Sequence, residues 1–206
     1  DEIYMRNTLM SMMRISSPMD KVPNLGFIKE MSVPDVLFGE LTDYSVEAGI
    51  ADDETQATLF ASFIFGLLTQ KPSEINTTFN YLKEKMGAQA ACDYLYNLSV
   101  KNNYIQKTAI SRNLLWEYKD GENVLEITIN LSKPEKDNKD IAKLVKADPS
   151  AKKYPKCPLC KENEGYLGNY NHPPRANLRT VSLNLCGEEW FLQYSPYAYF
   201  NEHCIV

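Results

Sequence analysis

A change in hydrophobic period near residue 116 is the feature that most constrains the fold of this chain. Before it, apolar residues recur at three- and four-residue steps, the spacing of one helix face; after it, they alternate or form short runs between turn residues. One chain therefore carries two kinds of secondary structure in succession. The sequence predicts an α+β fold, with a helical amino-terminal region over residues 1–119 and an antiparallel β domain over 120–206.

The helical region divides into several segments with recognisable ends. Pro34 favours the first turn of a helix and Gly49 a left-handed stop, which bounds one helix. A second is expected after the acidic run 52–54, a third with Ser73 as its N-cap, and a fourth after Gly87. The inward face of the fourth helix is predicted to hold Cys92, Leu95, Tyr96 and Ser99. These stripes indicate a hydrophobic core rather than a ligand site.

The second half has the turn signals of a β protein. The turn expected at 120–123 precedes a strand over 124–131, in which Leu125, Ile127, Ile129 and Leu131 share one half-buried face. A short helix is expected around 141–145. Further strands are predicted around 179–185, 190–194 and 197–206, separated by glycine and proline turns.

Charge and cysteine content exclude several classes of protein. The net charge is -5, with 22 Lys and Arg against 27 Asp and Glu, so a general nucleic-acid binder is not expected. No apolar run approaches the ~18 residues of a membrane helix. The five cysteines are odd in number and dispersed. This pattern favours reduced thiols in a cytoplasmic protein over a secreted disulfide framework.

The two ends of the chain suggest a portion of a longer protein. The sequence begins with Asp1 rather than Met, and it ends in the apolar run Cys204-Ile205-Val206, which is typical of a strand without a closing turn. We therefore expect the β sheet to be incomplete in this chain.

The spacing of Cys157 and Cys160 is the sharpest local motif. Two cysteines separated by two residues can direct both thiolates at one zinc ion, which accepts four sulfur or nitrogen ligands. An equally simple interpretation is a pair of reduced thiols at a turn; a thioredoxin-like redox pair is less favoured, because the motif lies in a proline-rich loop. The candidates for the remaining ligands are His172, His203, Cys186 and Cys204.

Two later segments carry side chains suited to a small anionic ligand. In residues 171–179, Arg175 and Arg179 can bind phosphate and Asn171 can bind a ribose or base edge; the alternative is a solvated loop. In residues 190–197, aromatic rings alternate with Gln193 and Ser195, a pattern that can hold a nucleoside or simply pack a strand. His203 lies in a strand-like pattern and favours a structural role.

Several motifs together resemble one enzyme family. They are Leu125 to Asp137, Tyr154 to Tyr166 around the cysteine pair, Asn171-His172-Pro173-Pro174-Arg175, Gln193-Tyr194-Ser195-Pro196-Tyr197, and Asn201 to Val206. Upstream, the segments 68–74, 93–99 and 103–105 show the same likeness. In this order they resemble the class II galactose-1-phosphate uridylyltransferases of Gram-positive bacteria, over essentially all 206 residues.

The resemblance implies a fold and a reaction. Members exchange UMP between glucose 1-phosphate and galactose 1-phosphate through a uridylyl-histidine intermediate, and their wider relatives have a histidine-triad-like antiparallel sheet and act as dimers. It implies UDP-glucose and galactose 1-phosphate as partners, and a homodimer for the full-length protein. The family's catalytic histidine belongs to a later His-x-His motif that these 206 residues lack. We therefore assign no catalytic residue in this segment and expect the chain alone to be inactive.

The resemblance also assigns roles to individual residues. Gln193, Tyr194 and Ser195 match positions where relatives contact the nucleoside, and Asn171, Arg175 and Arg179 complete the predicted substrate-binding set. Cys157 and Cys160 match a pair that binds zinc in class I relatives. Leu178 departs from the family pattern, where a polar residue is expected. The alternatives are a zinc-binding module or a helical interaction module, each without catalytic activity.

Overall fold

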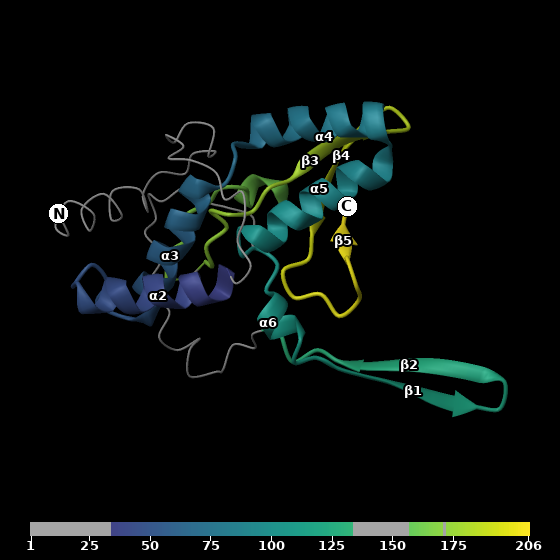
Figure 1. Ribbon diagram of the computed structural model, residues 1–206, viewed down its shortest axis with the longest axis horizontal. Coiled ribbons are helices and arrows are strands. Elements are labelled where there is room, and N and C mark those ends of the chain that lie inside the picture. Colours follow the sequence, from purple (N-terminus) through teal and green to yellow (C-terminus); the bar gives the residue numbers. More distant parts are fainter. Residues whose placement is uncertain (1–33, 134–156, 171) are drawn as a thin grey trace.

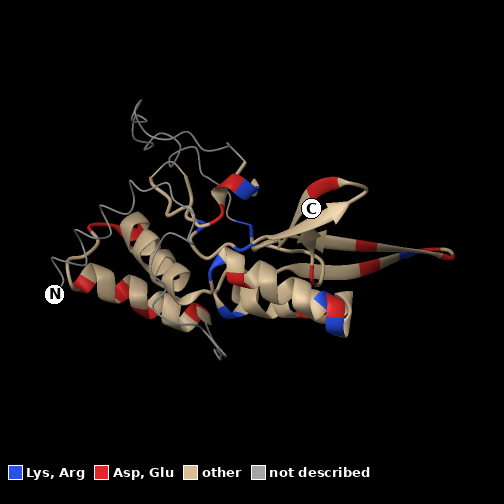
Figure 2. Cartoon of the chain, turned by 90° about the horizontal axis from the view of Figure 1, so that it is seen from above, with Lys and Arg blue, Asp and Glu red and all other residues tan. Residues whose placement is uncertain are grey.

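The computed structural model describes residues 34–133, 157–170 and 172–206. Helices come first along the chain and small antiparallel sheets follow, which confirms the predicted α+β class (Figure 1). The helix expected at 141–145 lies outside the described residues. None of the described helices combines the length and apolarity needed to cross a bilayer. In Figure 2 the basic positions of the described residues are scattered among acidic ones.

Helix α3 (Glu54–Leu68) is the centre of the first half. Asp53 caps it, because its carboxylate accepts a hydrogen bond from the backbone N–H of Gln56 at 2.9 Å. Helix α2 (Pro34–Glu47) packs against α3, and Pro34 begins α2 as predicted. Buried side chains lie all around α3 and form a cluster with later loops, comprising Ile50, Phe60, Phe63, Leu67, Leu167 and Ala176.

Gly66 lets α3 touch the loop that carries much of the candidate site. A Cβ atom at this position would lie 2.8 Å from the carbonyl oxygen of Ala176 and 2.9 Å from its Cβ, closer than side-chain atoms normally approach. A glycine is therefore required for this contact between helix and loop.

Helices α4 (Pro72–Met86) and α5 (Ala88–Lys101) form a hairpin joined by Gly87, whose φ of 94° suits only glycine. The predicted N-cap at Ser73 is wrong: α4 begins at Pro72, and the Glu74 carboxylate accepts from the backbone N–H of Lys71 at 3.1 Å. On the inward face of α5, Leu95 is buried as predicted and so is Ser99, whereas Cys92 and Tyr96 are only half-buried.

The α4–α5 hairpin packs on a three-stranded sheet of order β3-β4-β5. Strands β3 (Val181–Leu185) and β4 (Glu188–Tyr194) form an antiparallel hairpin, and the second buried cluster lies between them and the helices. Of the strand predicted at 197–206, only β5 (Cys204–Ile205) forms. The residues before β5 form turns and bends instead, and Glu202 has a left-handed φ of 51°, which an extended strand does not allow.

A second hairpin leaves the body after the short helix α6 (Lys107–Ile110). Strands β1 (Leu114–Asp120) and β2 (Asn123–Ile129) pair around the predicted turn and project away from the rest of the chain (Figure 1). The sequence placed the start of β1 in the helical region, which is wrong, and the boundary predicted at 119/120 falls inside the hairpin. The expected half-buried face is also wrong, since Leu125 is 55% exposed and Ile129 44%.

Candidate functional site

The Cys157–Cys160 segment forms a tight turn, which we call the cysteine turn. The backbone N–H of Cys160 donates to the carbonyl oxygen of Cys157 at 3.2 Å. Cys157 is exposed and Cys160 half-buried. A single 3-10 turn, η2 (Lys161–Asn163), follows and brings a fully buried side chain under the cysteines.

That buried side chain is Asn163, which the sequence analysis missed. Its Nδ2 donates to the Cys157 carbonyl at 3.0 Å, and its backbone N–H donates to the Cys160 carbonyl at 2.9 Å. Its Oδ1 is buried and accepts no hydrogen bond within the described structure. An asparagine three residues after the second cysteine was the only sequence signal available for this support.

Two of the predicted substrate-binding residues meet at the cysteine turn from different elements. Arg175 donates from Nε to the carbonyl oxygen of Pro158 at 3.2 Å, and Gln193 on β4 donates from Nε2 to that of Leu159 at 2.5 Å. The hydroxyl of Tyr104 in turn donates to Oε1 of Gln193 at 3.3 Å. These contacts fix the middle of the turn and hence the positions of both thiols.

The sequence predicts that the two thiols provide part of a zinc site. Partial burial, followed by the neighbouring Cys157, raises the pKa of the Cys160 thiol, so this thiol is protonated at neutral pH when no metal is bound. Throughout the described ranges, no three His, Cys, Asp or Glu side chains gather closely enough to hold an ion. His172, His203, Cys186 and Cys204 therefore do not join the pair in this structure, and zinc stays a prediction.

Arg179 lies inside the protein core, although the sequence predicted it to bind substrate. It is 1% exposed, and its guanidinium donates to five backbone carbonyls, at the end of α3 and in the loop before β3, which are those of Gly66, Thr69, Gln70, Ala176 and Leu178. It also lies near Glu164, whose pKa is raised by burial and held down in part by hydrogen bonds from Thr180 and by this cation. In this structure Arg179 ties the helical and β parts together.

The residues predicted to contact a nucleoside point in different directions, because successive strand residues alternate. Gln193 faces the cysteine turn, whereas Tyr194 faces α5 and donates from its hydroxyl to the carbonyl of Cys92 at 3.2 Å. Burial raises the pKa of Tyr194, which keeps this phenol protonated. Ser195 is half-buried beside His203, and its backbone N–H donates to the His203 carbonyl at 2.9 Å.

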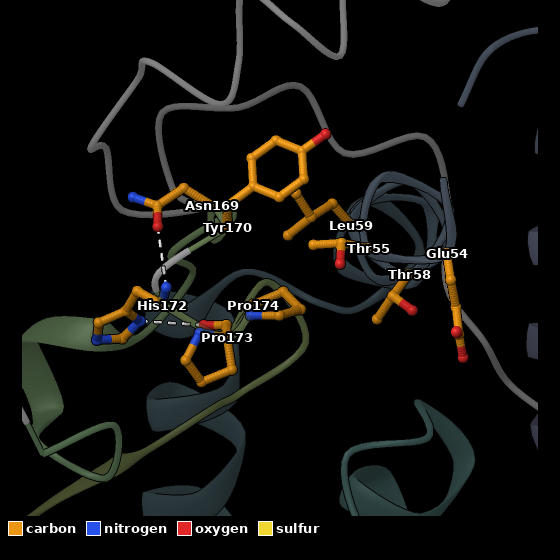
Figure 3. A pocket seen from close by; sticks show the side chains of 9 residues that line it. All are labelled: Glu54, Thr55, Thr58, Leu59, Asn169, Tyr170, His172, Pro173 and Pro174. Carbon is orange, nitrogen blue, oxygen red and sulfur yellow. Dashed lines mark hydrogen bonds between the residues drawn. The ribbon is translucent and has the colours of Figure 1, made fainter. Parts of the chain in front are cut away.

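The two histidines occupy separate places. His172 lies at the rim of a pocket of about 300 Å³ with Asn169 and residues of α3, as Figure 3 shows. Its Nδ1 is 3.1 Å from the carbonyl oxygen of Pro173, and its ring meets that of Tyr166 edge-on at 4.9 Å. Nδ1 of His203 is buried without a hydrogen-bond partner within the described structure, and its ring packs against two aromatic rings. Asn171 lies outside the described residues.

Comparison with protein families identifies the family of this chain. The family described as galactose-1-phosphate uridyl transferase, N-terminal domain, matches residues 43–206. The chain belongs to this family. The resemblance found in the sequence is confirmed over most of its length.

Individual galactose-1-phosphate uridylyltransferases show the same relationship. The protein of that name from Caldanaerobacter subterraneus subsp. tengcongensis is 45% identical over the whole chain, which covers 39% of that relative. That from Clostridium acetobutylicum is 41% identical, and galactose-1-phosphate uridylyltransferase 2 of Streptococcus pneumoniae serotype 4 is also 41% identical; the chain covers 40% of each. The chain thus spans about 40% of the length of these relatives. No solved structure matches it.

For a galactose-1-phosphate uridyl transferase N-terminal domain, the structure adds two residues to those found from sequence. Asn163 and Tyr104 support the cysteine turn through its backbone and through Gln193, and both are buried. Neither belongs to a motif of charged or metal-ligating residues, so only tertiary contacts reveal them.

Proposed function

We propose that this chain is the amino-terminal part of a uridylyltransferase that exchanges UMP between glucose 1-phosphate and galactose 1-phosphate. The observation that carries the proposal is the family match over residues 43–206, together with relatives at 41–45% identity that bear the name galactose-1-phosphate uridylyltransferase. UDP-glucose and galactose 1-phosphate would be the substrates. A homodimer stays a prediction.

The reaction proposed is a double displacement through a uridylyl-histidine. A neutral imidazole attacks the α-phosphorus of UDP-glucose, so a P–N bond forms as the P–O bond to glucose 1-phosphate breaks. A phosphate oxygen of galactose 1-phosphate then attacks the same phosphorus, the P–N bond breaks, and the imidazole is regenerated. Two displacements at one phosphorus allow the same groups to serve both sugar phosphates.

The nucleophilic imidazole is, in our proposal, neither His172 nor His203. A nucleophile must present a free ring nitrogen to the phosphorus. His203 has Nδ1 buried, and its ring packs edge-on against Tyr199 and Phe200. The His172 ring packs on Tyr166, with Nδ1 beside a backbone carbonyl. These placements support a structural role for both histidines.

Labelling with UDP-glucose that carries carbon-14 in the uridine tests this assignment. The chain, its His172→Asn and His203→Asn variants, and the full-length relative from Clostridium acetobutylicum are incubated with the nucleotide, and protein-bound label that is stable to alkali and released by acid is counted. We expect label on the relative and none on the chain. Stable label on the chain that disappears in one histidine variant would place the nucleophile within these residues and overturn the assignment.

A further inference from the structure

A pocket of about 270 Å³ lies between α3, the loop at 102–106 and the segment 173–177. Among the described residues that line it, Arg175 carries the only formal charge, and no Asp, Glu, Lys or His is present. It adjoins the pocket of Figure 3, with which it shares Thr58, Pro173 and Pro174. We call it the Arg175 pocket.

The Arg175 guanidinium is held in place but not neutralised. Its Nε and Nη1 donate to the carbonyl oxygens of Pro158 and Pro174, at 3.2 and 2.8 Å, and no described residue accepts from Nη2. A guanidinium has five N–H donors, so most remain for a ligand. Carbonyl oxygens satisfy hydrogen bonds, yet they leave the positive charge of this half-buried side chain without a counter-ion.

Arg179, only four residues further along the chain, has a guanidinium group in different surroundings. Its guanidinium is enclosed by five carbonyl oxygens, and the side chain is 1% exposed. The same side chain thus has a closed structural environment at one position and an open one at the other. The open one is suited to an anion that arrives from solution.

A second polar residue lines the Arg175 pocket. Asn103 is 3% exposed and has a left-handed φ of 57°. The backbone carbonyl of Asn103 accepts from Nε2 of Gln106 at 2.6 Å, which fixes this conformation. A side-chain amide that lines a pocket has two N–H donors with which it can bind an anion.

The remaining lining residues of the Arg175 pocket are uncharged, and several carry hydroxyl groups. Ser62 of α3, Tyr104 and Tyr197 line the pocket. Burial raises the pKa of Tyr104 to about 12 and raises that of Tyr197, while the charge of Arg175 opposes both shifts. Both phenols therefore stay protonated at neutral pH and offer no negative charge that would compete with an anion for Arg175.

The geometry points to the Arg175 pocket as a binding site for a phosphate monoester, with Arg175 and the Asn103 amide as donors to the phosphate. The volume suits a small ester rather than a whole nucleotide sugar. The inference rests on the proposed function only for the choice of ester, galactose 1-phosphate or UMP. The pocket joins the helical and β regions, so neither region alone would form it.

Calorimetric titration of the chain with galactose 1-phosphate, UMP and inorganic phosphate tests the inference, with uncharged galactose as the reference ligand. We expect at least one ester to bind, and Arg175→Gln to weaken it by about tenfold or more through loss of a charge-assisted contact. The matched control is Arg112→Gln, the same change at an exposed position, which should leave affinity unchanged. Amide proton–nitrogen spectra verify that each variant is folded.

Asn103→Asp gives a second route if Arg175→Gln fails to fold. Aspartate has the same shape and tolerates the left-handed region, but its carboxylate repels a phosphate, so we again expect a loss of about tenfold or more. Unchanged affinity in both folded variants, or no phosphate ligand bound by the folded chain, overturns the inference. Binding of inorganic phosphate alone, lost in the variants, supports an anion pocket and counts against the proposed function instead.

Discussion

The body of the molecule and the β1–β2 hairpin use similar apolar side chains in opposite ways. In the body, Phe60 and Phe65 are at most 2% exposed, whereas Trp116 and Tyr118 on the hairpin are 44% and 55% exposed. The strand register places Leu114 opposite Ile129, Trp116 opposite Ile127 and Tyr118 opposite Leu125, so these six side chains share one hairpin face. Alternation therefore identifies a strand but does not determine whether its apolar face is covered.

The opposite face of the hairpin carries a second sign of low local stability. Glu117 and Glu126 are direct cross-strand partners, and two like charges in this position repel. A lone two-stranded hairpin is marginal in water. We therefore expect the hairpin to open far more readily than the body.

The largest expected difference between the two regions is in the cost of removing an aromatic ring. Phe60→Ala should lower the free energy of unfolding by about 3–5 kcal/mol, because it leaves a cavity in the first buried cluster. Trp116→Ala, which removes a larger but exposed ring, should cost about 1 kcal/mol or less. Urea unfolding followed by far-UV circular dichroism measures both. Equal losses would show that the hairpin face is buried in solution.

A smaller effect on the free energy of unfolding is expected at alkaline pH. Burial raises the pKa of Tyr104 to about 12 in the folded chain, against about 10 for an unfolded tyrosine. The unfolded state then ionises first, so stability is full below about pH 10 and falls by up to about 2.7 kcal/mol as the pH rises to about 12.

Tyr104→Phe should flatten this alkaline decline, whereas Tyr118→Phe on the hairpin should not. Denaturant midpoints measured from pH 8 to pH 11.5 provide the comparison. A decline of the same steepness in Tyr104→Phe would show that this phenol is not the group responsible.

The smallest effect concerns the charge pair on the hairpin. Glu117→Lys replaces repulsion with attraction opposite Glu126 and should stabilise the hairpin by about 0.5 kcal/mol. Hydrogen exchange of the β1 and β2 amides should slow about twofold, with no change at α3. Slower exchange in α3 as well would mean that the two regions unfold together.

Much of the fold was accessible from the sequence because helices and strands have local periods. The helix ends at Pro34 and Gly87 and the turn between β1 and β2 follow from local chemistry. β1 was missed because Leu114-Leu115-Trp116 is a continuous apolar run without alternation. β5 was predicted too long because the left-handed φ of Glu202, just before it, is not visible in the residue pattern.

The candidate site was accessible only in part. Residue types and spacing singled out Cys157, Cys160, Arg175 and Gln193. They did not reveal that Arg175 and Gln193 hold the backbone of the cysteine turn. Arg175 and Arg179 look equivalent in the sequence, and only the tertiary structure separates an open cation from an enclosed one. Contacts between residues more than a dozen positions apart in the sequence produce no periodic pattern from which they could be predicted.

Gly66 allows the segment that carries Arg175 to lie directly against α3. One added methyl group there would push back Ala176, the residue directly after Arg175, because the backbone oxygen is already within 2.8 Å of where that methyl would lie. The displaced segment would carry its guanidinium away from Asn103 without any change to either donor. The absence of a larger side chain at Gly66 thus determines how Arg175 and Asn103 are aligned, although Gly66 contacts neither of them.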